Sequence, residues 1–295
     1  MGNAMPNPLL RLVTAELTAS ADPRAAAMAG ALAAQYPEAA RAVLFYGSCL
    51  RERNLDGLML DFYLIVSSYR AAYGRSWLAT ANRLIPPNVF PFEHNGLIAK
   101  YAILSEADFA RLNSPAADNV SVWARFAQPA RLLWAADDLA RQRAISAVAG
   151  AAPTLLSLAR PMTQAQDALS LWKAGFTLTY NAELRAEKKG RSVSIVDADP
   201  DRYRRFGEAA LAQGLPPSPP DPAKRWRALQ RRGKYLSVIR LAKASFTYAG
   251  GIDYLAWKIN RHAGTSIQIK PWQRRWPLVG ALTLLPRLFR GGAIR

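Results

Sequence analysis

The stretch AVLFYGSCLRERNLDGLMLDFYLIVS, residues 42–67, decides the fold. Residues 42–48 and 58–67 are apolar, rich in aromatic and β-branched side chains and of strand length, whereas the intervening CLRERNLDG is polar. This pattern predicts two β-strands joined by a loop, and we expect them to pair with each other. The first strand ends in Gly47-Ser48 and the second carries one acid, Asp61. We therefore expect this pair of strands to form the centre of the sheet and to carry the residues most indicative of a catalytic site.

The sequence on either side of this pair predicts alternating helices and strands. The order up to residue 104 is helix, strand, strand, helix and hairpin, and a short capped helix and one more strand complete the sheet. Asp22 as N-cap before Pro23 begins a helix over 22–40, and Pro86 and Pro87 end a helix over 69–84. Asn95-Gly96 is the turn of a hairpin over 88–104. Ser105, with Asp108 three residues later, caps the short helix, and the last strand covers 130–135.

Beyond about residue 154 the pattern is helical, so we predict an α+β protein with several units. The predicted units are a domain with a mixed sheet (1–150), a mainly helical second domain (151–214), a linker with five prolines (215–223) and a basic C-terminal helical segment (224–295).

Charge is concentrated at the C-terminal end. The formal net charge is +18, and residues 224–295 hold sixteen Lys or Arg against one acid, Asp253, which gives +15 of that total. Such a segment favours an anionic partner, either a lipid surface or a nucleic acid backbone. Four of the eight tryptophans lie in the same segment, which suits a membrane interface, although they can also stack on bases or belong to a solvated helical hairpin's core.

Cysteine and histidine content excludes several classes of protein. With Cys49 as the single cysteine no intrachain disulfide can form, and two histidines give no zinc-ligand spacing, so we expect a reducing compartment. The apolar run at 276–286 is shorter than the roughly 20 residues of a spanning helix. We expect no transmembrane segment and read the N-terminus as uncleaved.

The Gly-Ser turn and Asp61 together indicate nucleotidyl transfer and predict that residues 1–150 form a nucleotidyltransferase domain of the polymerase-β type. Nucleotidyltransferases of the polymerase-β type place a Gly-Ser turn where the backbone approaches a triphosphate, and carboxylates that hold Mg²⁺ on a neighbouring strand. The usual second acid, two residues away, is replaced by Met59. Asp56 or Glu93 is the candidate second metal ligand, with Glu93 preferred because a hairpin can bring its strand beside Asp61.

Several blocks resemble one family. The segments AQYPEAARAVLFYGS, MLDFYLIV, NGLIAKYAILSEADF, WARFAQPARLL, FTLTYNAELRAEKKGRSVSIVDADPDRYRRF and IRLAKASFTYAGGI are similar to the mitochondrial-type phosphatidate cytidylyltransferases, the translocator assembly and maintenance proteins, as a bacterial-like member. A hydrophobic residue at the Met59 position agrees with this family. Cys49 stands where the family has a second glycine, and the family's His-containing block is absent from 69–84.

The resemblance implies transfer of CMP from CTP to phosphatidic acid, giving CDP-diacylglycerol and pyrophosphate with Mg²⁺ as cofactor. It also implies a peripheral membrane protein at the cytoplasmic face of the inner membrane, or at the matrix face if mitochondrial, with no nucleic acid partner. The implied site residues are Asp61 and Lys100 as catalytic groups, Tyr46, Gly47, Ser48, Tyr180 and Arg185 for the nucleotide, and Arg125 and Arg131 for phosphate.

Simpler interpretations stay open beside this one. Lys100 also fits an edge-strand lysine that blocks aggregation, and Cys49 fits a small buried filler better than a nucleophile. Two other functions remain: a nucleotidyltransferase that acts on RNA or another soluble acceptor, and a non-catalytic, membrane-bound descendant in which the lone Asp61 no longer binds metal.

Overall fold

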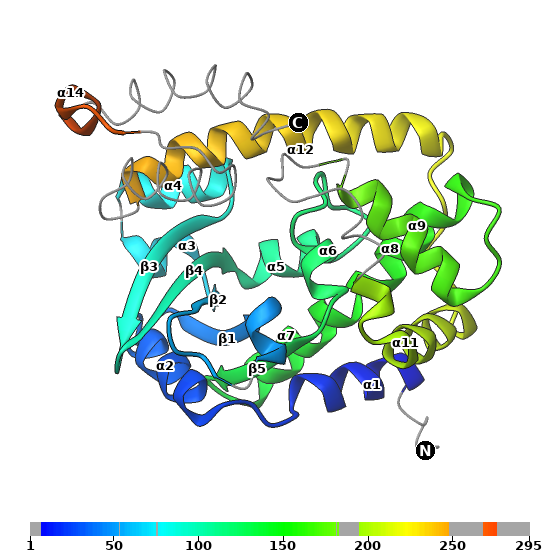
Figure 1. Ribbon diagram of the computed structural model, residues 1–295, viewed down its shortest axis with the longest axis horizontal. Helices are drawn as coiled ribbons and strands as arrows, with labels where there is room; N and C mark the ends of the chain where they lie inside the picture. The colour runs from blue at the N-terminus through cyan, green and yellow to red at the C-terminus, as the bar shows by residue number, and fades with distance from the viewer. Residues whose placement is uncertain are drawn as a thin grey trace.

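A computed structural model describes residues 7–52, 54–74, 76–180, 182, 195–247 and 268–275 (Figure 1). Its centre is a five-stranded sheet in the order β3-β4-β2-β1-β5. β1 is antiparallel to β2 and β5, β2 is parallel to β4, and β3 is antiparallel to β4. The strands are β1 (Ala40–Tyr46), β2 (Met59–Val66), β3 (Asn88–His94), β4 (Leu97–Ser105) and β5 (Ala130–Ala135). The predicted α+β class with a mixed sheet is confirmed.

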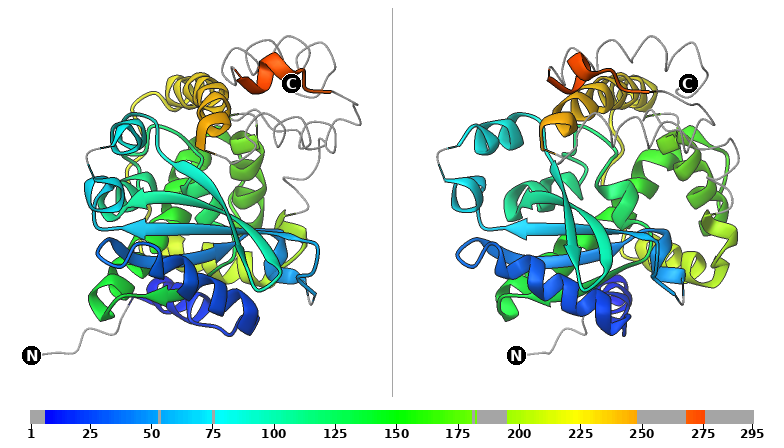
Figure 2. Two further views of the ribbon diagram at one scale, coloured as in Figure 1. Left: turned by 90° about the vertical axis from the view of Figure 1, so that its left-hand side faces the viewer. Right: turned by 60° about the vertical axis from the view of Figure 1, so that its left-hand side comes forward.

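Helices surround the sheet and extend the molecule on one side (Figure 2). They are α1 (Pro8–Leu17), α2 (Pro23–Ala34), α3 (Tyr69–Tyr73), α4 (Trp77–Leu84), α5 (Glu106–Leu112), α6 (Trp123–Phe126), α7 (Asp138–Ala149), α8 (Ala151–Ala159), α9 (Ala168–Tyr180), α11 (Pro200–Ala212), α12 (Pro222–Thr247) and α14 (Pro271–Arg275), with 3-10 turns η1 (Ser48–Arg51) and η2 (Arg160–Met162). None of the described helices is both long and apolar enough to cross a bilayer.

The two faces of the sheet are buried in different layers. Because side chains alternate along a strand, Leu60, Phe62 and Leu64 of β2 pack with α2, and Tyr63 and Ile65 belong to the opposite core. That opposite core is the larger one and continues from the sheet into the helices α8, α9 and α11. Asp61 has the same parity as Tyr63, so it lies on the face of the larger core.

Most predicted elements are present. β1 and β2 pair as expected, and the hairpin turns at Asn95 (φ 48°) and Gly96 (φ 75°). The Ser105 hydroxyl accepts a hydrogen bond from the Asp108 amide at 3.2 Å, as its cap requires. The single helix predicted over 69–84 is wrong: it divides into α3 and α4, because Gly74 takes a positive φ of 64° that ends the first helix.

The helical part is continuous with the sheet's core. α8 starts immediately after α7, and one hydrophobic cluster draws residues from both sides of position 150. The proposed division into units stays a prediction.

α12 lies along one side of the molecule, from the helical layer to α4 and β3 (Figures 1 and 2). Trp226, in its first turns, is fully buried and donates a hydrogen bond to the Leu158 carbonyl at 2.8 Å. At least the start of the basic segment therefore belongs to the core. The apolar stretch at 276–286 falls outside the described residues.

Candidate functional site

The candidate site lies where β1, β2 and β4 place three residues in one row. Tyr46 pairs with Asp61, and Asp61 pairs with Lys100. Paired residues point to the same face of a sheet, so the three side chains share one face. The Lys100 ammonium lies 2.9 Å from Asp61 Oδ1, and the two side chains are 30% and 21% exposed. The row is an accessible ion pair beside a tyrosine.

Gly47 brings the backbone against the Asp61 carboxylate. Its φ of 96° and ψ of −169° lie in a region that only glycine adopts readily. A Cβ built on Gly47 would sit 3.2 Å from Asp61 Oδ2. Both constraints demand glycine here, and the close approach is the arrangement expected of a phosphate-binding turn. Ser48, the first residue of η1, is exposed beside it.

Cys49 does not contribute a reactive group to this turn. It is 7% exposed, and its thiol donates a weak hydrogen bond to the Met59 carbonyl at 3.5 Å. Burial, and then the negative charge of Asp61, raise the pKa of the Cys49 thiol. A raised pKa keeps the thiol protonated, so the geometry agrees with a filler.

Arg125 closes the site on the side of α6. It hydrogen-bonds to the Tyr46 hydroxyl and also donates to the Ser121 carbonyl. Burial is the main cause that raises the pKa of Tyr46 well above its ordinary value; the Asp61 charge raises it further, and Arg125 opposes the shift. Tyr46 therefore stays a neutral phenol that interacts with both the Arg125 guanidinium and the Asp61 carboxylate.

Arg131 is not part of this group. Arg131 lies on β5 and pairs with Phe45 of β1, next to the pair formed by Tyr46 and Ala130. Its side chain therefore starts on the opposite face of the sheet from Tyr46. It lines a separate pocket with residues of α1 and α11. The two predicted phosphate-binding arginines therefore lie in different places.

The two candidate second ligands are also apart from Asp61. Asp56 forms a 2.7 Å ion pair with Arg24 of α2, the helix that covers the other face of the sheet. Glu93 shares the Asp61 face, since it lies two residues beyond Pro91, the partner of Lys100. The expected adjacency of its strand is wrong: β4 separates β3 from β2, and two strand spacings amount to about 10 Å.

The helical residues predicted to contact the nucleotide are only partly described. Tyr180 is the last residue of α9 and is half-buried against the larger core. Arg185 lies outside the described residues.

The donor set limits which metal arrangement fits. Among the described residues, no group of three or more His, Cys, Asp and Glu side chains could hold an ion. Mg²⁺ usually keeps several waters and binds one or two carboxylates together with substrate phosphates. Asp61 fits that role for an ion that arrives with a triphosphate. A cage made by protein ligands alone does not fit.

A second arginine and a lysine reach this side of the molecule from α12, and the sequence analysis missed them. Arg240 donates to the Ser121 hydroxyl at 3.0 Å and to the Pro86 carbonyl at 2.8 Å, so Ser121 links it to Arg125. Lys243 donates to the carbonyls of Ile85 and Pro87. No local sequence signal could have located these contacts, because about 120 to 160 residues separate the partners.

A larger cavity, of about 740 Å³, lies near the opposite ends of β1 and β2, between α5 and α7. Its charged groups are occupied with one another: Glu106 pairs with Arg143 at 3.1 Å and with Arg41 at 3.6 Å. Small apolar side chains make up much of the remaining wall. This cavity lacks the convergent reactive groups found around Asp61.

No protein-family model matches the chain, and no curated protein matches it. Among solved structures it is similar to a nucleotidyltransferase-like protein from Exiguobacterium sibiricum, with 13% sequence identity over 92% of each chain and a TM-score of 0.28. A TM-score this low does not support a shared fold. The functional assignment therefore depends on the geometry of this chain.

Proposed function

We propose that the protein is a nucleotidyltransferase, and specifically that it transfers CMP from CTP to phosphatidic acid to give CDP-diacylglycerol and pyrophosphate. The observation that carries the proposal is the meeting of Gly47, Asp61 and Lys100 at three neighbouring strands, with a 2.9 Å contact between Asp61 and Lys100. A glycine turn beside an accessible carboxylate and ammonium suits a triphosphate better than a neutral substrate.

The chemistry requires little from the protein beyond placement and charge. A phosphate oxygen of phosphatidate attacks the α-phosphorus of CTP, the bond from that phosphorus to the bridging oxygen breaks, and pyrophosphate leaves with the electron pair. The nucleophile is already anionic, so no strong general base is needed. Lys100 and Arg125 would bind phosphate oxygens, and the backbone at Gly47 would line the triphosphate. Asp61 would hold Mg²⁺, which supplies charge neutralisation.

The described part of α12 supports a membrane location for this activity. Lys224, Arg227, Arg231 and Lys234 are all exposed and are spaced three or four residues apart, so they form one outward stripe. We call these four residues the basic stripe. Each cation near an anionic bilayer contributes about 1 kcal/mol of attraction. Phosphatidate stays in its bilayer, so this helix face would bring the enzyme to its substrate as a peripheral protein.

Incubation of the full chain with Mg²⁺, labelled CTP and phosphatidate vesicles tests the proposal. Asp61→Asn should lower kcat/KM by about 100-fold or more, because one group that stabilises developing charge is typically worth that much. Asp56→Asn is the matched control and should leave turnover unchanged, since Asp56 pairs with Arg24. Full turnover in the Asp61 variant would overturn the assignment.

Two additions to this assay separate the alternatives: RNA as a second acceptor, and measurements of vesicle and nucleotide binding. Labelled RNA in place of labelled CDP-diacylglycerol would indicate a soluble acceptor. Vesicle binding with no Mg²⁺-dependent nucleotide binding would indicate the non-catalytic descendant. Glu93→Gln, compared with Asp56→Asn, shows whether Glu93 contributes to apparent Mg²⁺ affinity from its place on the same sheet face.

A further inference from the structure

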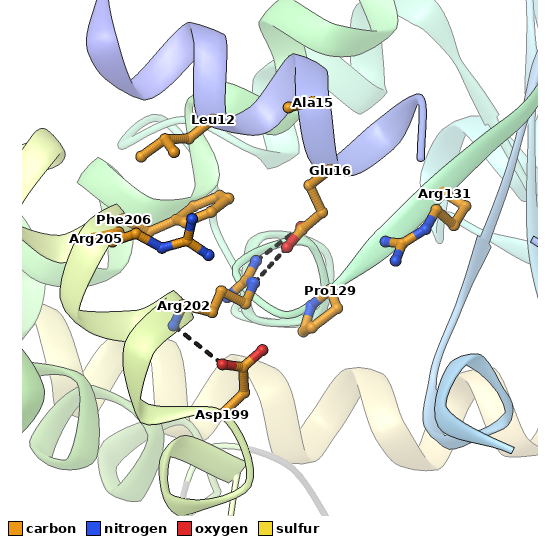
Figure 3. Close-up of a pocket in the computed structure, with 9 residues that line it drawn as sticks. All are labelled: Leu12, Ala15, Glu16, Pro129, Arg131, Asp199, Arg202, Arg205 and Phe206. Carbon is orange, nitrogen blue, oxygen red and sulfur yellow. Dashed lines mark hydrogen bonds and ion pairs between the residues drawn. The ribbon is translucent and has the colours of Figure 1, made fainter. Parts of the chain in front are cut away.

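A second charged pocket, of about 250 Å³, lies at the β5 edge of the sheet (Figure 3). α1 contributes Glu16, the start of β5 contributes Arg131, and α11 contributes Arg202 and Arg205. With Asp199, the pocket holds three cations and two carboxylates, a net charge of +1. None of these residues enters the proposed function.

Within the pocket, Arg202 and Glu16 form an ion pair with each other. Arg202 is 4% exposed and donates to both Glu16 oxygens, at 2.5 and 2.9 Å, and to the Ala127 carbonyl at 3.1 Å. Its guanidinium also lies 4.3 Å from the centre of the Phe206 ring. The charge of Glu16 is therefore neutralised, and Arg202 has a structural role between α1 and α11.

The other two arginines have no such carboxylate partner within the described residues. Arg131 donates from Nη1 to the Ala130 carbonyl at 2.9 Å, but its Nε is buried without a hydrogen-bond acceptor. Arg205 makes a 3.4 Å contact with the Asp201 carbonyl. Figure 3 shows the guanidinium groups of Arg131 and Arg205 on opposite sides of Glu16, both turned toward the pocket. A buried N–H without an acceptor calls for a water or a ligand to complete it.

We propose that this pocket binds a small phosphate-bearing anion between Arg131 and Arg205. The planar guanidinium matches phosphate oxygens bidentately, and the net positive charge favours an anion. The volume is below the 300 to 1,000 Å³, roughly, of pockets for drug-sized ligands, so a nucleotide is too large. The ligand is therefore a free phosphate or pyrophosphate, or the phosphate of a lipid headgroup. It binds apart from Asp61, because Arg131 starts on the other face of the sheet.

Isothermal titration calorimetry of the full chain tests this site, with inorganic phosphate, pyrophosphate and short-chain phosphatidate added in separate runs at constant ionic strength. Wild type should show saturable binding of at least one probe. Arg131→Gln and Arg205→Gln should each weaken it by about tenfold or more, the effect of losing one charge-assisted hydrogen bond. Arg204→Gln is the matched control, because Arg204 is exposed on the same helix but does not line the pocket and is paired with Asp201.

The comparison between probes identifies the source of the phosphate. Binding of phosphate or pyrophosphate alone indicates a soluble anion, and binding of short-chain phosphatidate alone indicates a headgroup. Absence of saturable binding to wild type overturns the proposal, and so does equal weakening by Arg204→Gln and Arg205→Gln. Lys100→Gln should retain binding; if it abolishes binding, the anion occupies the Asp61 site instead. Since Arg205 is exposed, its variant should keep the wild-type circular dichroism spectrum.

Discussion

At the residue scale, the site depends on a glycine that no other residue can replace. Gly47→Ala would force a Cβ into a glycine-only backbone conformation and within 3.2 Å of Asp61 Oδ2. We expect a loss of about 1–3 kcal/mol in the free energy of unfolding, together with loss of nucleotide affinity. Urea denaturation and equilibrium binding of CTP measure the two effects.

Gly57→Ala is the control for this substitution. Gly57 also has a positive φ, of 72°, but no atom lies within 4 Å of the position that a methyl group would take there. Its variant should lose about 1–2 kcal/mol of stability from backbone strain and keep full CTP affinity. If both variants bind CTP as wild type does, the turn at Gly47 does not contact the nucleotide.

The candidate residues that the structure brings together include two that local pattern located in the sequence, Gly47 and Asp61. Gly47 and Asp61 follow from two short apolar runs, and the pairing of these strands brings them together. Lys100 was expected from the family resemblance, and only the observed position of β4 brings it beside Asp61. The position of Arg131 was not accessible in this way, because a shift of one residue along a strand changes the face on which a side chain lies.

At the element scale, α12 carries a buried lysine that should make the stability of the protein depend on pH. Lys243 is 9% exposed, and burial, with the nearby Arg240 charge, lowers its pKa from 10.5 to about 7. In the unfolded chain the amine stays protonated up to about pH 10.5, so unfolding between pH 7 and 10.5 takes up a proton. The free energy of unfolding contributed by this group should therefore rise with pH across that window, by at most about 1.4 kcal/mol per unit.

The comparison with Lys243→Met isolates this effect. Other titrating groups cancel in the difference between wild type and variant, so that difference should grow in favour of wild type from about pH 7 to about pH 10 and stay constant below about pH 7. Chemical denaturation at several pH values measures it. A difference that does not change with pH would mean that Lys243 remains charged in the folded protein.

Element types were predicted more completely than their arrangement. Apolar runs of strand length locate the strands within one or two positions, and turn residues locate the hairpin, because both signals are local. The order β3-β4-β2-β1-β5 depends on contacts distant in sequence, and no local pattern places β4 between β3 and β2. This explains why Glu93 was expected beside Asp61 and is not.

At the scale of the whole molecule, the Glu16 and Arg202 pair joins helices 186 residues apart. Arg202→Met leaves the Glu16 carboxylate without its partner in a site where that side chain is 14% exposed. Removing one member of a buried pair costs about 3–5 kcal/mol. Urea denaturation should show a loss of that size, against about 1 kcal/mol or less for Arg204→Ala, which removes an exposed pair. Equal losses would show that α1 and α11 are held by apolar packing alone.

The proposed membrane association also belongs to the scale of the whole molecule, and the buried position of Trp226 determines how to test it. Shortening the chain before α12 would remove a core residue, so substitutions on the basic stripe are the better probe. Lys224→Glu, Arg227→Glu and Arg231→Glu together change the local charge by six units on a face that is exposed. They should abolish co-sedimentation with anionic vesicles at physiological salt and leave the fold intact.

The control variant removes a single positive charge from the same helix, at a residue outside the basic stripe. Arg232 is exposed but forms a 2.6 Å ion pair with Asp118, so Arg232→Gln should weaken vesicle binding far less than the triple variant does. Raising the salt concentration should weaken wild-type binding, because Debye screening shortens the reach of each charge. If the triple variant sediments as well as wild type does, the basic stripe is not the membrane contact. Preferential binding of wild type to single-stranded RNA at matched salt would instead assign α12 to a nucleic acid partner.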